Sequence, residues 1–425
     1  MNLWGSTPSG MTRRHFMQHL AGASAMALPA IALTDSIRAN AQELSSRNKS
    51  AILLWMGGGP STLDIWDLKP GAATGGPFSP IATTAADVQI TEHLPLVAKQ
   101  MHHLSVVRSM STREADHGRG RYYMHTGYVP NPNIEHPGYG SVISHELAGT
   151  RTDLEIPPFV SVGGGSVGPG FLGMTYAPFV VGTDGQVKNL KMGVTQDRLE
   201  QRMHMLATIE RGFVQQQRGD AAAEHAKVLD KTLSLMTSQQ MEAFKVAGEP
   251  PEVRDRYGRT GFGNGCLMAR RLVEQGVPFV EVDMGGWDNH SGIFPTLENT
   301  KLPELDQAMS ALVEDLAERG LLEDTAILWM GEFSRTPRIN GNAGRDHWAR
   351  SWSVVLGGAG MTGGIAVGQT SPDGAEVVTD PYSSEDLMAT VCQALGISLN
   401  TTFTSKNGRP MKIAAGGRVI KELFA

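Results

Sequence analysis

The sequence predicts an α/β protein, a three-layer sandwich with a mainly parallel central sheet and a helical insertion. Short apolar runs recur along the 425-residue chain, and each is bounded by glycine clusters or other turn signals. The runs are almost continuously apolar, which is typical of strands buried on both faces. Segments with a helical period lie between them. Strands that alternate with helices favour a parallel sheet covered by helices on both faces.

The predicted strands are spread over most of the chain. They are residues 51–56, 104–107, 279–282, 326–330 and 353–356. The first ends abruptly in Gly57-Gly58-Gly59-Pro60, and the last precedes a further glycine cluster. Because ligands bind beyond the carboxyl ends of the strands in open parallel sheets, we expect functional residues just after these runs.

The regions between the strands differ in composition. Residues 150–190 are rich in Gly, Pro and Val and are interpreted as an irregular insertion. Residues 196–246, rich in Gln, Met and Ala, have a helical period and are interpreted as a cap, and Leu302–Glu318 is a further predicted helix. We therefore expect one α/β domain over residues 42–425, with an insertion or cap at roughly 150–250.

The first 41 residues have the order of a twin-arginine signal peptide. Arg13 and Arg14 are followed by an apolar run of small residues, 20–33, which is shorter than the ~20 residues of a membrane span. Ala39-Asn40-Ala41 then resembles a signal-peptidase site, which places the mature N-terminus at Gln42. We expect the twin-arginine translocase to export the chain to the periplasm or beyond. The alternative is an amphipathic N-terminal helix of the folded domain.

Charge and hydropathy exclude some classes of partner. Residues 1–41 hold three of the 37 basic and one of the 43 acidic side chains, so the remainder has a net charge of −8. Without a basic stripe, nucleic acid is not expected as a partner, and without a second long apolar run no stable membrane span is expected. Cys266 and Cys392 are interpreted as buried free thiols, although pairing between them stays open, as does the choice of Met1 or Met11 as initiator.

Acidic and imidazole side chains gather around the predicted strand ends. They are Asp64, Asp288, His290, Glu332, Asp346 and His347. Such side chains bind divalent metal ions, and this mixture does not distinguish Zn, Mn, Ca and Mg. Because adjacent side chains diverge, we expect one of Asp346 and His347 to bind an ion while the other orients it or binds a second centre. The alternative is that these pairs form ordinary surface hydrogen bonds.

Basic side chains near these acids suit an anionic ligand. Arg335 and Arg345 offer planar donors that match a pair of phosphate or sulfate oxygens. In the segment 116–127, His117 and Arg121 share one face of a predicted helix, whose N-terminus would favour an oxyanion. His125 and the two tyrosines of this segment are interpreted as helix packing.

Several motifs are similar to those of a known family. They are G-G-P-S-x-x-D at 58–64, G-W-D-x-H at 286–290, G-E-F-x-R-T-P at 331–337 and G-R-D-H-W at 344–348. They resemble the bacterial family called domain of unknown function 1501, which is sulfatase-like and lies within the alkaline phosphatase and sulfatase superfamily. Residues 305–330 also resemble the sulfatase helix that ends in G-L-x-D-N-T and leads to the strand before a metal-binding acid. Residues 386–390 resemble the superfamily's D-I-x-P-T helix, so the resemblance covers essentially all of residues 42–425.

The resemblance implies the superfamily's fold and a divalent metal ion. Asp288 and His290 correspond to the Asp and His of its first metal, and His347 to its late histidine. Glu332 falls where the superfamily has a metal-binding Asp. The first strand ends in glycine where a further ligand Asp is expected, and Asp64 is the nearest substitute.

The implied activity is hydrolysis of a phosphate or sulfate ester of a small molecule or glycan. His117 falls where the superfamily has its nucleophile, a Ser, Thr or modified Cys. It is expected to form a phosphoramidate, to bind the metal or to act as a general base. Arg121 and Arg345 would hold the anion. The alternative is a non-catalytic relative that binds an anionic glycan or a partner protein.

Overall fold

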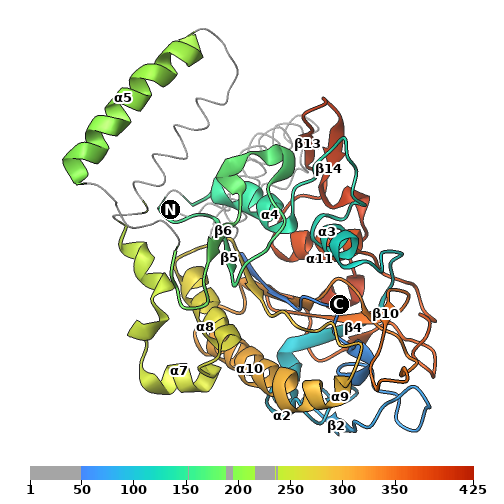
Figure 1. Cartoon of the computed structure of the whole chain (residues 1–425). Coiled ribbons are helices and arrows are strands. Elements are labelled where there is room, and N and C mark those ends of the chain that lie inside the picture. Colours follow the sequence, from blue (N-terminus) through green and yellow to red (C-terminus); the bar gives the residue numbers. More distant parts are fainter. Residues whose placement is uncertain (1–48, 152, 188–194, 216–234, 236–237) are drawn as a thin grey trace, which may run out of the picture. The chain divides into compact units, whose positions relative to one another are not determined.

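The computed structural model describes residues 49–151, 153–187, 195–215, 235 and 238–425 (Figure 1). The described residues belong to one compact unit, Asn48–Ala425. The predicted signal peptide, residues 1–41, lies outside the described residues. Within the described ranges, no helix combines the length and the apolar character needed to cross a membrane.

The compact unit is built on an eight-stranded sheet with the order β12-β4-β11-β8-β1-β7-β5-β6. Its strands are β1 (Ser50–Trp55), β4 (Leu104–Met110), β5 (Phe159–Val162), β6 (Phe179–Val181), β7 (Phe279–Asp283), β8 (Thr325–Met330), β11 (Trp352–Gly357) and β12 (Ala366–Val367). β1 pairs in parallel with β7 and β8, whereas β11 is antiparallel to both of its neighbours. The predicted α/β fold with a mainly parallel sheet is therefore confirmed.

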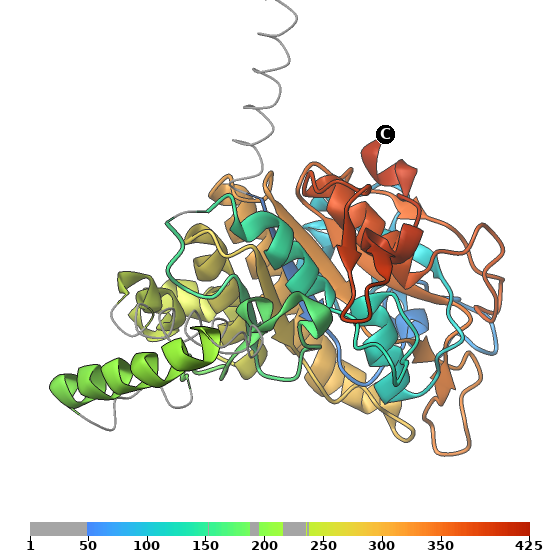
Figure 2. The same ribbon diagram turned by 90° about the horizontal axis from the view of Figure 1, so that it is seen from above.

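Alternate residues of the strands build two cores, one on each face of the sheet. Ile52 and Leu54 lie in the core under α2 (Pro95–Ala98), α8 (Gly261–Glu274) and α10 (Leu302–Glu318). Leu53 and Trp55 lie in the core under α3 (His117–Thr126), α4 (Tyr139–Ala148) and α11 (Ser384–Ala394). Figure 2 shows helices on both sides of the sheet. This is the predicted three-layer sandwich.

The stretch 150–190 is more regular than predicted. It supplies β5 and β6, which extend the sheet in parallel beyond β7, and the interpretation as an irregular insertion is wrong for these residues. Each strand is short and surrounded by Gly and Pro, so the local sequence contains little strand signal. In the predicted cap, the structure describes α5 (Gln196–Gln215) and a 3-10 helix, Gln239–Phe244.

The remaining elements are short. They include α7 (Pro251–Tyr257), α9 (Ile293–Thr296), a π-helical turn (Leu297–Lys301), and the two-stranded sheets β2–β3 (Pro80–Ala82, Gln89–Thr91), β9–β10 (Ser334–Arg335, His347–Trp348) and β13–β14 (Thr402–Thr404, Pro410–Lys412). The two cysteines are free: Cys266 lies in the α8 core and Cys392 in the α11 core, on opposite faces of the sheet. They therefore cannot pair.

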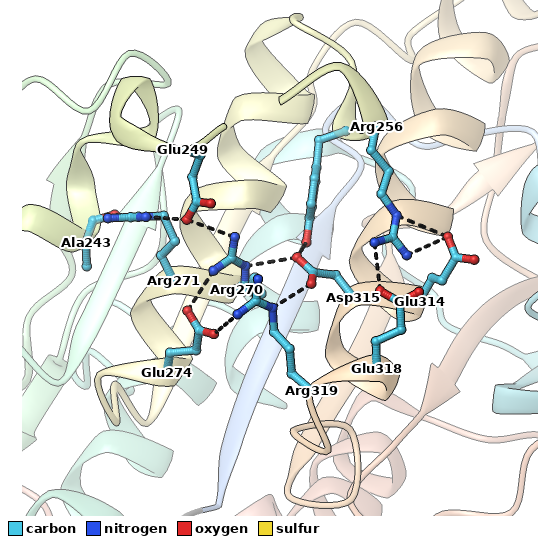
Figure 3. A network of polar contacts seen from close by, with 11 residues as sticks. Ala243, Glu249, Arg256, Arg270, Arg271, Glu274, Glu314, Asp315, Glu318 and Arg319 are labelled. Atoms are coloured by element: carbon cyan, nitrogen blue, oxygen red, sulfur yellow. Dashed lines mark hydrogen bonds and ion pairs between the residues drawn. The ribbon is translucent and has the colours of Figure 1, made fainter. Parts of the chain in front are cut away.

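A buried arginine ties together the layer that contains α8 and α10 (Figure 3). Arg270 of α8 contacts Glu249 at 3.0 Å, Glu274 at 2.7 Å and Asp315 at 3.0 Å, and its side chain is only 2% exposed. Asp315 also accepts a hydrogen bond from the Tyr257 hydroxyl at 2.8 Å. The opposite charges and hydrogen bonds of this network offset the desolvation cost of burying these groups.

Candidate metal centre

The N-terminus of α3 brings His117 to the carboxyl ends of the central strands. Asp116 caps the helix by accepting a hydrogen bond from the Arg119 N–H at 3.0 Å, so the helix begins at His117. It ends at Gly127, whose φ of 73° is readily adopted by glycine. The prediction that His117 and Arg121 lie on one helix is confirmed.

Asp288 lies at the centre of a group of histidines from distant segments. It follows β7, and its carboxylate is 2.9 Å from Nε2 of His290, 3.3 Å from Nε2 of His117 and 3.4 Å from Nε2 of His347. The Nε2 atoms of His290 and His347 are 3.2 Å apart. The structure thus brings together four of the residues singled out in the sequence.

The other ring nitrogen of each histidine faces a group that only accepts hydrogen bonds. Nδ1 of His117 is 2.6 Å from the Glu332 carboxylate, and Nδ1 of His290 is 2.8 Å from that of Asp346. Nδ1 of His347 is 2.8 Å from the Ala115 carbonyl oxygen. A proton on Nδ1 of each ring satisfies these partners and leaves the Nε2 atoms facing Asp288.

Three Nε2 atoms therefore face one carboxylate. A cation, either a metal ion or the second proton of a histidine, compensates the negative charge of Asp288 at these separations. Nε2 of His117 is buried and has no hydrogen-bond partner. One ligand atom each from His117, Asp288 and His347 lies within 4.8 Å of the others, which matches the requirements of a metal site.

Arg335 is a cluster residue that was not among the predicted metal-site residues. It ends β9, its side chain is fully buried, and its Nη2 donates to Asp288 at 2.7 Å. Its Nε donates to the Gly59 carbonyl at 2.7 Å, and Nη2 also donates to that of Gly58. Burial alone would raise the pKa of Asp288, but the Arg335 hydrogen bond and charge overcome it and lower that pKa to about 2. Asp288 is therefore ionised at neutral pH.

Glu332, which the sequence predicts as a ligand, stands behind His117 instead. One of its oxygens accepts from His117 and from the Gly58 N–H at 3.0 Å, and the side chain is almost completely buried. The hydrogen bond to Glu332 raises the pKa of His117 in spite of partial burial. In this position Glu332 orients the imidazole. Asp346 has the equivalent position behind His290.

Asp64 and Arg345 differ from their predicted roles. Arg345 donates Nε and Nη2 to the Asp64 carboxylate at 2.8 and 2.7 Å, and neither side chain is exposed. The remaining donors of Arg345 bind the carbonyl oxygens of Thr336, Pro337 and Thr74. The polar atoms of both side chains are engaged in these hydrogen bonds, so Asp64 is not available to bind a metal ion and Arg345 is not available to bind an anion.

Arg121 is also engaged away from the cluster. Its Nη2 lies 3.4 Å from Asp283 and 3.7 Å from Glu281, both on β7. The aromatic ring of Phe333 packs 5.0 Å from the ring of His117 and 4.9 Å from that of His347. It supplies an apolar wall rather than a ligand.

The described chain is similar to several solved structures. They include the PsFucS1 sulfatase from Pseudoalteromonas sp. (14% identity, covering 84% of this chain and 70% of that one, TM-score 0.39) and a protein in the alkaline phosphatase superfamily from Vibrio parahaemolyticus (12%, 89%, 70%, 0.39). A phosphonate monoester hydrolase of Agrobacterium radiobacter is another (12%, 88%, 77%, 0.35). At such identities and TM-scores, no activity is carried over from them.

Comparison with curated proteins finds no significant match. A family model described as "Protein of unknown function (DUF1501)" matches residues 48–424. The match spans the central sheet, both helical layers and every residue of the histidine cluster. The chain therefore belongs to the DUF1501 family.

Proposed function

We propose that this protein is an exported, metal-dependent hydrolase of phosphate or sulfate esters in which His117, Asp288 and His347 hold the metal ion. The observation that carries the proposal is the convergence of three Nε2 atoms on the Asp288 carboxylate. His117 then serves as a ligand, with Glu332 fixing its tautomer, rather than as a nucleophile.

The donor set favours a transition metal such as zinc. Imidazole suits zinc, whereas calcium, magnesium and manganese prefer oxygen ligands. Three protein ligands leave a coordination position for water, which is typical of catalytic rather than structural zinc sites. When bound, such an ion acidifies water and polarises an ester oxygen.

The surrounding residues would direct the ester and the water. The first turn of α3 begins at His117, so its N-terminal end favours the negative charge of a phosphate or sulfate group at the cluster. Arg335 holds Asp288 and the Gly58–Gly59 turn in fixed relation. The side chains that contact Asp288 are histidines and an arginine, so attack by water suits the site better than a covalent seryl intermediate.

Metal content is the first test. The exported protein is purified without added metal, analysed by elemental spectrometry, and then stripped and reloaded. We expect about one equivalent of a transition metal, a loss of thermal stability on chelation, and a strong loss of binding in His347→Ala. His145→Ala is the matched control, since His145 is similarly exposed and also contacts a carboxylate, Glu146. A protein without metal, whose stability is unaffected by chelation, would falsify the metal site.

Hydrolysis is tested separately on aryl phosphate and aryl sulfate esters. We expect turnover that requires the metal and is lost in Asp288→Ala. A metal-loaded protein that hydrolyses neither class would leave the alternative, a non-catalytic protein that binds an anionic glycan or a partner. Equal activity of His117→Ala and wild type would show that His117 has no role in the hydrolysis.

Export is tested with Arg13→Lys/Arg14→Lys. We expect this double variant to remain in the cytoplasm with residues 1–41 attached, because the translocase recognises the arginine pair. Normal export of the variant would rule out the twin-arginine route.

A further inference from the structure

Three basic side chains one helical turn apart on α3 contact three acids carried by β7 and the loop after it. His117 faces Asp288 at 3.3 Å. Arg121 faces Asp283 at 3.4 Å, and His125 faces Glu281 at 3.1 Å. As α3 advances from His117 to His125, its partners run backwards from Asp288 to Glu281. These contacts form a ladder of three rungs between the helix and the strand.

The spacing of the rungs fits the two elements. Four residues of an α-helix advance by about 6.0 Å. Two residues of a parallel strand advance by about 6.6 Å. Glu281 and Asp283 therefore meet His125 and Arg121 with little mismatch when the helix lies along the strand. Their neighbours on β1, Leu53 and Trp55, share this face of the sheet.

The inner rung is a buried contact between His125 and Glu281. Nε2 of His125 faces the Glu281 carboxylate, and its Nδ1 faces the Arg121 carbonyl oxygen at 2.9 Å, so both ring nitrogens face acceptors. This geometry fixes the orientation of the ring, whichever nitrogen donates. Burial alone would raise the pKa of Glu281, but the charge and hydrogen bond of His125 and a hydrogen bond from Ser166 overcome it and lower that pKa.

Stability alone does not explain why these polar groups are buried. An ionic group inside a sheet is often no more stabilising than apolar residues of similar size, but it accepts only one alignment of its partners. The ladder adds to other contacts of α3, in which the Tyr123 hydroxyl donates to Glu385 at 2.6 Å and Ser384 Oγ donates to the Tyr123 carbonyl oxygen at 3.0 Å. Two glycines, Gly118 and Gly120, lower its helix propensity, and Met124 is its one buried large apolar residue. The Trp55 ring packs between the rungs, 4.1 Å from the His125 ring and 5.3 Å from the Arg121 guanidinium.

We propose that Glu281 and Asp283 are positioning residues, which hold Arg121 and His125 so that α3 presents His117 to Glu332 and Asp288. A shift of α3 by one rung along the strand would move the His117 Nε2 atom out of the cluster. The consequence for metal binding rests on the proposed function, but the alignment of α3 does not require a metal ion.

The test measures the coupling between His117 and Glu332 in the metal-free protein. A double-mutant cycle with His117→Ala and Glu332→Gln, followed by chemical unfolding, gives this coupling. The cycle is repeated in a Glu281→Gln background and in an Asp315→Asn background. Asp315 is the matched control, a buried carboxylate that also contacts arginine but lies in the α10 layer. If the background substitution has only a structural effect, it lowers the free energy of unfolding but leaves the coupling between His117 and Glu332 unchanged.

We expect clear coupling in the wild type, loss of most of it in Glu281→Gln, and no change in Asp315→Asn. The metal dissociation constant should rise roughly 10- to 100-fold in Glu281→Gln only, as for other residues that orient ligands. If Glu281→Gln does not fold, Asp283→Asn replaces it, because this partly exposed rung is less costly to weaken. Unchanged coupling in the Glu281 or Asp283 background, or no coupling in the wild type, would overturn the proposal. A wild type that binds no metal but loses coupling in Glu281→Gln supports the ladder and rejects only the metal site.

Discussion

The buried pair of Asp64 and Arg345 tests whether Asp64 stabilises the fold, as the structure indicates, or binds the metal ion, as the sequence predicts. Asp64→Asn keeps the shape of the side chain but removes its charge. The Arg345 guanidinium then remains fully buried without its counter-ion. Breaking a buried ion pair costs about 3–5 kcal/mol. Because Arg345 keeps its bonds to the carbonyl oxygens of Thr336, Pro337 and Thr74, we expect the lower end, about 3 kcal/mol.

For the unit Asn48–Ala425, the entropy of unfolding is about 0.8 kcal/mol/K, so this loss corresponds to about 4 °C in Tm. Guanidinium unfolding of the metal-free protein measures the free energy, and competition with a chromophoric chelator measures metal affinity. We expect lower stability with unchanged affinity. The double variant Asp64→Leu/Arg345→Met should recover only part of the loss, because an apolar pair can replace the ion pair but leaves the carbonyl oxygens of Thr336, Pro337 and Thr74 without the Arg345 donors.

The opposite result would refute this reasoning. If Asp64→Asn leaves stability within about 0.5 kcal/mol and weakens metal binding at least tenfold, Asp64 is a ligand, as the sequence predicts. Loss of stability of which the double variant recovers nothing would show that the pair is not the source of the effect.

Three further predictions concern the centre and its supports. Metal affinity should fall on acidification from about pH 8 to about pH 6 in competition titrations, because the metal must displace a proton from His117. The pKa of His117 is raised above 6.5 without metal, so its protonated form stabilises the metal-free fold below that pH, and this stabilisation is lost as pH rises through the raised pKa. Gly58→Ala should lower both the free energy of unfolding and the metal affinity, because Gly58 has a φ of +113° and a Cβ there would lie 2.7 Å from the backbone nitrogen of Asp288. Gly320→Ala is the control: Gly320 has a φ of +68° but lies in open space, so this variant should cost only about 1 kcal/mol of unfolding free energy and leave metal binding unchanged. Arg270→Met should destabilise the protein by about 3–5 kcal/mol in chemical unfolding without changing metal affinity.

The sequence predicts the fold well where local composition decides structure. The helix Leu302–Glu318 has the predicted bounds, because its apolar period is strong and continuous. The central strands are recognisable because they are buried on both faces. Residues 159–162 and 179–181 are not, since only pairing beyond β7 makes strands of such short segments.

Individual partners in the site are harder to predict than the strands that carry them. Asp64 and Arg345 are 281 residues apart, so nothing local indicates that they neutralise each other. Arg335 lies in a recognised motif and was interpreted as an anion ligand. Its role depends on two carbonyl oxygens in the glycine turn after β1, which a sequence does not orient.

The distances along the chain between cluster partners have a consequence for the time course of folding. The bond from His117 to Glu332 spans 215 residues, and that from His347 to Ala115 spans 232. Contacts this remote form late, because the loops between them must be closed first. A compact intermediate with its sheet formed but α3 undocked would bury Trp66 and Trp329, which lie in the core on the other face of the sheet, and still be unable to hold an ion. Ion uptake during refolding would therefore lag behind the change in tryptophan fluorescence and report the arrival of the native state.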